Sequence, residues 1–291
     1  MAENHLTLYL LPSPLGIQWT SPARLAWSAL KNRVTLKKHF MGHAFVEFEW
    51  RGKRELTGMD GRHCDDLRQL LVYGRGLGIL FHSFRGLLQK KEDLDPELAG
   101  YFQKGTVNFI RFLLNDGQCE RIAEYLKVFR ERNLARHYGL ANRPRHGEGA
   151  GCSAFAASFA EVAGVMDQEM IDEWSNTVNI PMEYAGPPLR ERKVSFVSLM
   201  WNAGRWATED EEHRKLFFWD PDRMFKWIGR HVRTANGAFK MASIEKARGI
   251  VADRTHLPAP DEPIWLSEKI TAENSVPAEP VAPAGAEFLP T

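Results

Sequence analysis

The sequence has few cysteines, almost no net charge and no long apolar run, and each of these shortages excludes a class of protein. Three cysteines in 291 residues are too few and too scattered for a disulfide framework or a cysteine-rich metal site. The 38 basic and 37 acidic residues leave a net charge of +1, so charge gives no basis for a nucleic-acid partner. No apolar run approaches the roughly 20 residues that span a bilayer, and the amino terminus lacks the basic region of a secretory signal. Composition therefore predicts a globular, cytoplasmic protein without a transmembrane segment.

Apolar periodicity predicts a mixed α+β chain. The clearest element is a β-hairpin, in which residues 42–50 alternate apolar and polar side chains and a turn at 51–53 leads into 54–59. Residues 65–88 mix helical spacing with a glycine cluster, which suits a loop or a strand as well as a helix. Further strands are predicted at 5–11, 194–201 and 217–219, and helices at 21–30, 96–114, 119–134, 153–162, 168–174 and from Pro221 to 228. From about Leu257 the chain is rich in Pro, Ala and Glu, so residues 257–291 are expected to form an extended or disordered tail.

The most informative segment is a glycine-rich loop that leads directly into a helix. Residues 147–151 read Gly-Glu-Gly-Ala-Gly, and Cys152 follows at the first turn of the predicted helix. Unpaired backbone N–H groups and the positive end of the helix dipole favour thiolate over thiol at such a position, and the thiolate is the nucleophile. The alternative is that Cys152 is an unreactive, buried cysteine on a helix that only packs in the core. A packing helix, however, does not need a glycine-rich loop before it. We therefore take Cys152 as the candidate nucleophile.

A base is needed to take the proton of such a thiol, and His43 is the best candidate. It lies at the start of the predicted hairpin, far upstream of Cys152. His63 and His146 compete for the role, but His146 lies in a loop too close in sequence to Cys152 to approach its sulfur from an orienting strand. The backbone around Gly151 and Ser153 is expected to bind the substrate, because N–H groups at the helix start would face the oxyanion of an attacked carbonyl.

Together these segments resemble a known family. A strand that begins Gly42-His43, then a hairpin, then helices, and then a helix that begins Cys152-Ser153 with Phe155 in its first turn, is similar to the circularly permuted papain-like hydrolases of the NlpC/P60 superfamily, including its lecithin–retinol acyltransferase-like group. The histidine precedes the cysteine, as the permutation requires. The resemblance implies an α+β fold over residues 1–256, in which an antiparallel sheet packs against the cysteine helix and residues 65–140 form a helical insertion.

The same resemblance implies a third, polar residue that orients the imidazole from the strand after the histidine. Glu55 is the first candidate for this role, and Glu47, Thr57 and Asp60 remain alternatives. Neither Cys64 nor Cys119 has a motif around it, and both are interpreted as structural. No ligand pattern at zinc spacing is present, and the glycine loop lacks the lysine of a phosphate-binding loop, so we expect neither a metal nor a cofactor.

The expected function is that of a cysteine-dependent hydrolase which cleaves an amide through an acyl-enzyme. The substrate would be a peptide or a peptidoglycan fragment. Two alternatives stay open: a lipid acyltransferase or thioesterase of the same fold, and a non-catalytic scaffold in which Cys152 is structural. Several tryptophans of the later half of the chain suit either a core or a groove for an acyl chain or a sugar-peptide, namely Trp174, Trp201, Trp206, Trp219 and Trp227.

Overall fold

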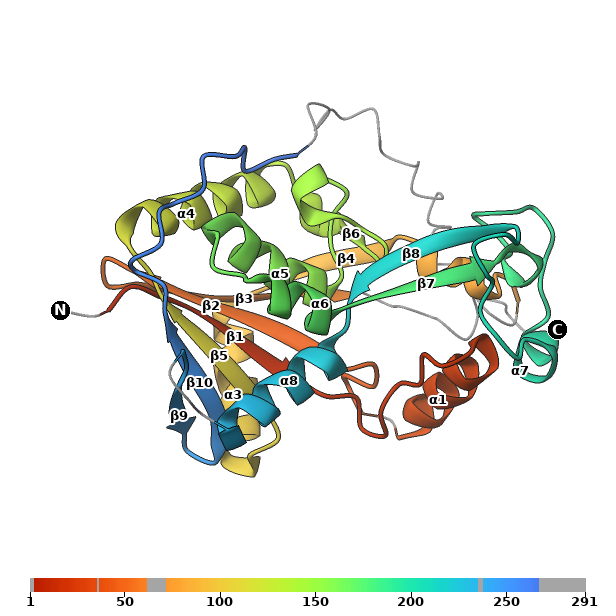
Figure 1. Ribbon diagram of the computed structural model, residues 1–291, viewed down its shortest axis with the longest axis horizontal. Helices are drawn as coiled ribbons and strands as arrows, with labels where there is room; N and C mark the ends of the chain where they lie inside the picture. Colours follow the sequence, from red (N-terminus) through yellow and green to blue (C-terminus); the bar gives the residue numbers. More distant parts are fainter. Residues whose placement is uncertain (1–2, 36, 62–71, 235–237, 267–291) are drawn as a thin grey trace, which may run out of the picture.

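The protein is built around one large, mostly antiparallel sheet (Figure 1). The computed structural model describes residues 3–35, 37–61, 72–234 and 238–266, and within them the sheet has the strand order β6-β4-β3-β2-β1-β5-β10-β9. The strands are β1 (His5–Leu11), β2 (His43–Trp50), β3 (Lys53–Gly61), β4 (Phe84–Gln89), β5 (Asn108–Leu113), β6 (His137–Tyr138), β9 (Lys240–Ile244) and β10 (Ala247–Asp253). Every pair of neighbours is antiparallel except β5 and β10, which run parallel. The predicted α+β class and the predicted hairpin are confirmed.

Helices cover both faces of this sheet. On one face lie α4 (Asp116–Glu131), α5 (Cys152–Ala163), α6 (Gln168–Trp174) and α8 (Pro221–Thr234); α3 (Lys91–Lys104) lies on the other. The side chains of β1 explain why helices cover both faces of the sheet. Its alternate side chains Leu6, Leu8 and Leu10 join the core under α5 and α8, whereas Tyr9 and Leu11 join the core under α3. All seven residues of β1 are buried, as expected of a central strand.

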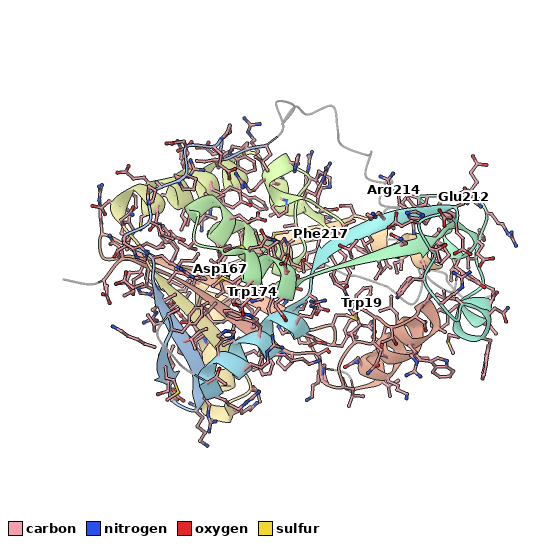
Figure 2. All side chains as sticks on the ribbon, viewed as in Figure 1. Trp19, Asp167, Trp174, Glu212, Arg214 and Phe217 are labelled. Atoms are coloured by element: carbon pink, nitrogen blue, oxygen red, sulfur yellow. The ribbon has the colours of Figure 1, made fainter. Side chains whose placement is uncertain are left out.

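A second, smaller core lies at one end of the sheet (Figure 1). The antiparallel ribbon of β7 (Ser175–Pro181) and β8 (His213–Trp219) extends from the main body towards α1 (Pro22–Val34) and α7 (Phe196–Asn202). Leu25 of α1, Leu199 of α7 and Phe218 of β8 belong to one hydrophobic cluster. Trp19 lies between α1 and the ribbon (Figure 2), with its ring centroid 4.2 Å from that of Phe218. This cluster matters for the site because it forms the walls of the main cavity.

Two predicted elements are wrong. The helix expected at 96–114 ends at Lys104, since Gly105 adopts the left-handed conformation, and the chain continues as β5. Phe109 faces one core and Ile110 the other, so this apolar run has a strand period. The strand expected at 194–201 is the helix α7, in which Ser195 caps the N–H of Ser198 and Leu199 faces inwards.

Two predicted boundaries also change. Residues 65–140 do not form a helical insertion: β5 pairs with both β1 and β10 and lies inside the sheet, while residues 62–71 are outside the described part. The main body extends past residue 256: residues 257–266 form no helix or strand, as an extended tail would, but the N–H of Leu266 donates to the carbonyl of Arg145 at 2.8 Å and Trp265 packs against the main core. The expectation for residues 267–291 lies outside the described residues.

Candidate active site

The glycine loop carries Cys152 to the first turn of α5, with Gly151 as the N-cap residue. The loop lies against β6: Gly149 has a φ of +81°, and a Cβ added there would lie 2.2 Å from the carbonyl oxygen of His137. Only glycine combines this backbone conformation with this close approach. The N–H of Ala150 then donates to the same carbonyl oxygen at 3.0 Å. The loop is thereby tied to the sheet, and it sets where the cysteine helix begins.

The structure brings Cys152 and His43 together. His43 opens β2, while the ladder between β2 and β3 runs from Trp50–Lys53 only as far as Val46–Thr57, so the first residues of β2 lie beyond its end. Burial acts to raise the pKa of the Cys152 thiol, but the charge of His43 and its hydrogen bond to the sulfur lower it below its ordinary value. The Tyr138 side chain and the backbone N–H of Ala44 also bond to the sulfur and lower the pKa. The surroundings of this sulfur therefore favour the thiolate.

Gln89, at the end of β4, holds the imidazole from the other side. Its Oε1 lies 3.2 Å from Nε2 of His43, which leaves Nδ1 for the sulfur of Cys152. The hydroxyl of Thr57 donates to the backbone carbonyl of Gln89 at 3.1 Å, and this bond fixes the end of the strand. His39 stacks on the His43 ring at 3.9 Å between centroids, and its own Nε2 lies 2.8 Å from Glu97. The imidazole is thus held at Nε2 and against one of its faces.

Glu55, the expected orienting residue, is not beside His43. In the ladder it pairs with Phe48, and its carboxylate lies 2.8 Å from Nη2 of Arg130 on α4. The prediction of Glu55 is therefore wrong, and Gln89 orients the imidazole instead. The two hairpin strands pair from Trp50–Lys53 onwards, so Glu55 lies far from His43 at the start of β2. Of the alternatives, Glu47 is bound to Arg54 and Tyr9, and Asp60 accepts the N–H of Gly61. Thr57 touches the site only through the backbone of Gln89.

The other candidate cysteines and histidines either lie elsewhere in the structure or fall outside the described residues. Cys119 on α4 is 0% exposed, and burial followed by the negative charge of Asp116 raises its pKa to about 12. His146 lies in the short 3-10 helix Pro144–His146, where burial and Arg143 lower its pKa. Cys64 and His63 are outside the described residues. Cys152 and Cys119 are both free thiols, and their surroundings shift their pKa values in opposite directions.

Cys152 lines an apolar cavity of about 250 Å³. Although the residue is only 7% exposed, its side chain belongs to the cavity lining, so a bound molecule can reach it. Gly151 and Ser153, the predicted substrate-binding residues, also line the cavity, but the Ser153 hydroxyl donates to the carbonyl of Trp219 at 2.6 Å. Ser153 therefore offers the cavity its backbone and not its hydroxyl. The apolar walls come mainly from the second core, namely Ile17, Trp19, Leu25, Ala26, Leu77, Leu80, Phe196, Leu199 and Phe218.

Two carboxylates, those of Asp220 and Asp222 at the start of α8, also line this cavity. Burial, followed by the negative charge of Asp222, raises the pKa of Asp220 to about 6. Asp222 accepts the N–H of Ser13 at 2.6 Å and the N–H of Ile17 at 3.0 Å. These bonds fix the loop after β1, so Asp222 holds the cavity wall in place. In the described part of the chain, no group of three or more His, Cys, Asp or Glu side chains could hold a metal ion.

No protein-family model, no curated protein and no solved structure matches this chain. Among the described residues, no helix is both long enough and apolar enough to cross a membrane.

Sequence reasoning missed two residues of the site, Gln89 and Tyr138. Gln89 follows a glycine-rich region without clear periodicity, and Tyr138 lies in a strand of two residues. Neither has a local pattern that would reveal it, because each reaches the sulfur or the imidazole only through strand pairing with distant segments.

Proposed function

We propose that the protein is a cysteine-dependent acyl hydrolase with a permuted papain-like arrangement of its catalytic residues. The observation that carries this proposal is the contact between His43 and Cys152, which lines an apolar cavity. A buried thiol that is merely structural has its pKa raised, as Cys119 does, whereas that of Cys152 is lowered. Perturbed groups that converge in a cavity are typical of active sites.

In the proposed reaction, Nδ1 of His43 takes the proton of the Cys152 thiol. The thiolate attacks the carbonyl carbon of the substrate and forms a C–S bond, while the carbonyl oxygen becomes an oxyanion. The imidazolium then gives the proton to the leaving group, whose bond to the carbonyl carbon breaks, and a thioester remains on Cys152. Water, deprotonated by His43, attacks this thioester, and the carboxylic acid and the thiol are released. Gln89 acts as a positioning residue that keeps Nδ1 directed at the sulfur.

Two kinds of donor support the oxyanion in this proposal. The first-turn N–H groups of α5, including that of Cys152, have no partner in the preceding turn of a helix and carry the positive end of its dipole. The Tyr138 hydroxyl already donates to the sulfur and lines the same cavity, so it is close to the carbonyl that the sulfur would attack. Donors placed before the reaction stabilise the charge that develops during it.

The cavity favours a hydrophobic acyl group over a peptide or a peptidoglycan fragment. A peptide substrate needs donors and acceptors for its amide groups, whereas the cavity walls are apolar side chains from α1, α7 and β8. An alkyl chain suits these walls, and its carbonyl would lie at Cys152. We therefore favour the ester or thioester of a lipid acyl chain as the substrate, ahead of the amide expected from sequence.

The first test is selective alkylation of the three thiols. With iodoacetamide at pH 7, we expect Cys152 to react at least about tenfold faster than Cys119, because a thiolate exists above its pKa and only the pKa of Cys152 is lowered. His43→Ala should slow this reaction, whereas the exposed His256→Ala serves as the matched control. Peptide mass spectrometry reports each cysteine separately. Equal, slow labelling of Cys152 and Cys119 would support the scaffold alternative.

The same protein tests the substrate class. Release of p-nitrophenol from the dodecanoate ester should exceed release from the acetate ester, and a dodecanoyl adduct on Cys152 should be visible by mass spectrometry. A preference for acetate, or cleavage of peptide amides alone, would refute the lipid substrate while leaving the nucleophile in place.

A further inference from the structure

Helices α1 and α7 lie at the same end of the molecule (Figure 1), and their outer surfaces expose large apolar side chains. On α7, Val197 is 62% and Trp201 72% exposed. On α1, Trp27 is 37% exposed, and its ring meets that of Trp201 edge-on at 6.0 Å between centroids. Leu15, in the loop before α1, and Val34, at the end of α1, are exposed as well. We call Leu15, Trp27, Val34, Val197 and Trp201 the tryptophan face.

Positive charge accompanies the tryptophan face on α1. The exposed side of α1 carries Arg24, Trp27, Lys31 and Val34 at helical spacing, so cations alternate with apolar residues along it. No Asp or Glu occurs between Glu3 and Glu47 of the sequence. Within the described part of the chain, neither Arg24 nor Lys31 forms an ion pair or another electrostatic contact. On the α7 side, Arg190 and Arg205 are paired with Glu212 and Glu211, so the charge that accompanies the tryptophan face is that of Arg24 and Lys31.

The inner surfaces of the same two helices line the cavity of Cys152. Leu25, Leu30 and Arg33 of α1 and Phe196 and Leu199 of α7 belong to its lining. Each helix therefore has one apolar side towards the cavity and a second apolar side towards the outside, and on α1 this outer side also carries the cations Arg24 and Lys31. The tryptophan face lies directly across this wall from the space proposed for the acyl chain.

We propose that the tryptophan face docks the protein onto the surface of an anionic lipid bilayer. Tryptophan is the side chain that prefers the boundary between headgroups and acyl chains, and lysine and arginine beside it bind anionic headgroups. The overall charge of +1 does not oppose this, because the cations Arg24 and Lys31, unpaired among the described residues, lie on the face itself. The delivery of an acyl chain to the cavity rests on the proposed function, whereas the docking itself does not.

Vesicle sedimentation of the full chain tests the docking. The Cys152→Ser protein, which cannot hydrolyse lipid, is mixed with vesicles of phosphatidylcholine alone or of phosphatidylcholine with 30% phosphatidylglycerol. We expect binding to the anionic vesicles that weakens with added salt, and weaker binding to the neutral ones. Trp27→Ser with Trp201→Ser should weaken the binding at least about tenfold, as should Arg24→Glu with Lys31→Glu. The matched controls are Met241→Ser, and Lys226→Glu with Arg248→Glu, which alter exposed side chains on β9, α8 and β10.

Three results would overturn the docking. The first is equal binding to neutral and anionic vesicles, and the second is a loss of binding that is the same in the control variants. The third is a dimer in solution, measured by light scattering, that Trp201→Ser converts to a monomer, because the face would then join two copies of the chain. Circular dichroism shows whether each variant is folded, and the charge variants test the docking even if the tryptophan variants do not fold. If the Cys152→Ser protein binds vesicles but the native protein forms no acyl adduct on Cys152, the docking stands and the proposed function falls.

Discussion

At the scale of single residues, the difference between Cys152 and Cys119 shows that burial alone does not decide the state of a thiol. Both side chains are buried. Around Cys119 the positive charge of Arg51 does not outweigh the cost of burial, and the negative charge of Asp116 increases that cost. Around Cys152 an imidazole, a phenol and a backbone N–H all point at the sulfur. Three polar neighbours therefore reverse the direction in which burial moves a pKa.

Gln89 is the residue on which the orientation of His43 depends. Gln89→Ala removes the acceptor at 3.2 Å from Nε2, and the ring can then turn away from the sulfur. We expect alkylation of Cys152 at pH 7 to slow about tenfold and its pH profile to move towards alkaline pH, because the thiol loses its partner. Gln89→Glu, which keeps an acceptor, should restore the neutral profile. An unchanged profile in Gln89→Ala would contradict the positioning role, and Gln18→Ala, an exposed glutamine, is the control.

Local sequence predicts residues whose role is local. Cys152 at the first turn of α5 and His43 at the start of β2 were predicted because a glycine loop and an alternating strand surround them. Gln89 was not, and Glu55 was predicted in its place, because the partner of an imidazole depends on which strand ends lie side by side. The structure sets this through pairing of Gly58 with Gln89 across β3 and β4, which no pattern within either segment records.

At the scale of elements, the site depends on where α5 begins, and the contact between Gly149 and β6 sets that position. Gly149→Ala places a Cβ against the carbonyl of His137 in addition to the backbone cost of a positive φ. Gly52→Ala has a similar φ of +72° with no atom within 4 Å, so it carries the backbone cost alone. We expect Gly52→Ala to cost about 1 kcal/mol and Gly149→Ala clearly more, with slower alkylation of Cys152 only in the latter. Urea denaturation measures the first quantity, and equal losses in both variants would contradict it.

The wrong elements share a physical cause. Residues 105–114 and 194–201 are short apolar segments, in which a period of two and a period of 3.6 are hard to separate. In each case the structure is decided by a residue at the boundary: Gly105 ends α3 before β5, and Ser195 caps α7. Longer elements with clear caps or turns, such as the hairpin of β2 and β3 and the helix α4 with its capping box, follow the prediction.

At the scale of the whole molecule, a buried ion cluster on the α3 side of the sheet links stability to pH. Burial acts to raise the pKa of Glu47, but a hydrogen bond with His5 and the guanidinium of Arg54 outweigh it and lower the pKa from 4.5 to about 2. A carboxyl whose pKa is lowered by folding stabilises the native state above its unfolded pKa, and this contribution is lost as the pH falls from about 4.5 towards 2.

We therefore expect acid to destabilise the protein through Glu47. Between pH 7 and pH 3 the free energy of unfolding should fall by about 2 kcal/mol more in the native protein than in Glu47→Gln, which has no charge to lose. Urea titrations at a series of pH values give both curves. Parallel curves would show that the cluster does not couple folding to protonation, and Glu55→Gln, with its half-exposed partner Arg130, is the control.

The bonds from Asp222 to the loop after β1 have a consequence for the order in which the protein matures. His43 and Cys152 both precede α8 in the chain, so a growing polypeptide contains the reactive pair long before it contains the carboxylate that anchors Ser13 and Ile17. Until Asp222 has been synthesised, the loop that forms part of the cavity wall is not anchored. Asn108 of β5 also lacks its partner Arg248 at that stage, because β10 follows α8 in the chain. The wall of the cavity is therefore completed only after the segment that carries both His43 and Cys152 has been synthesised.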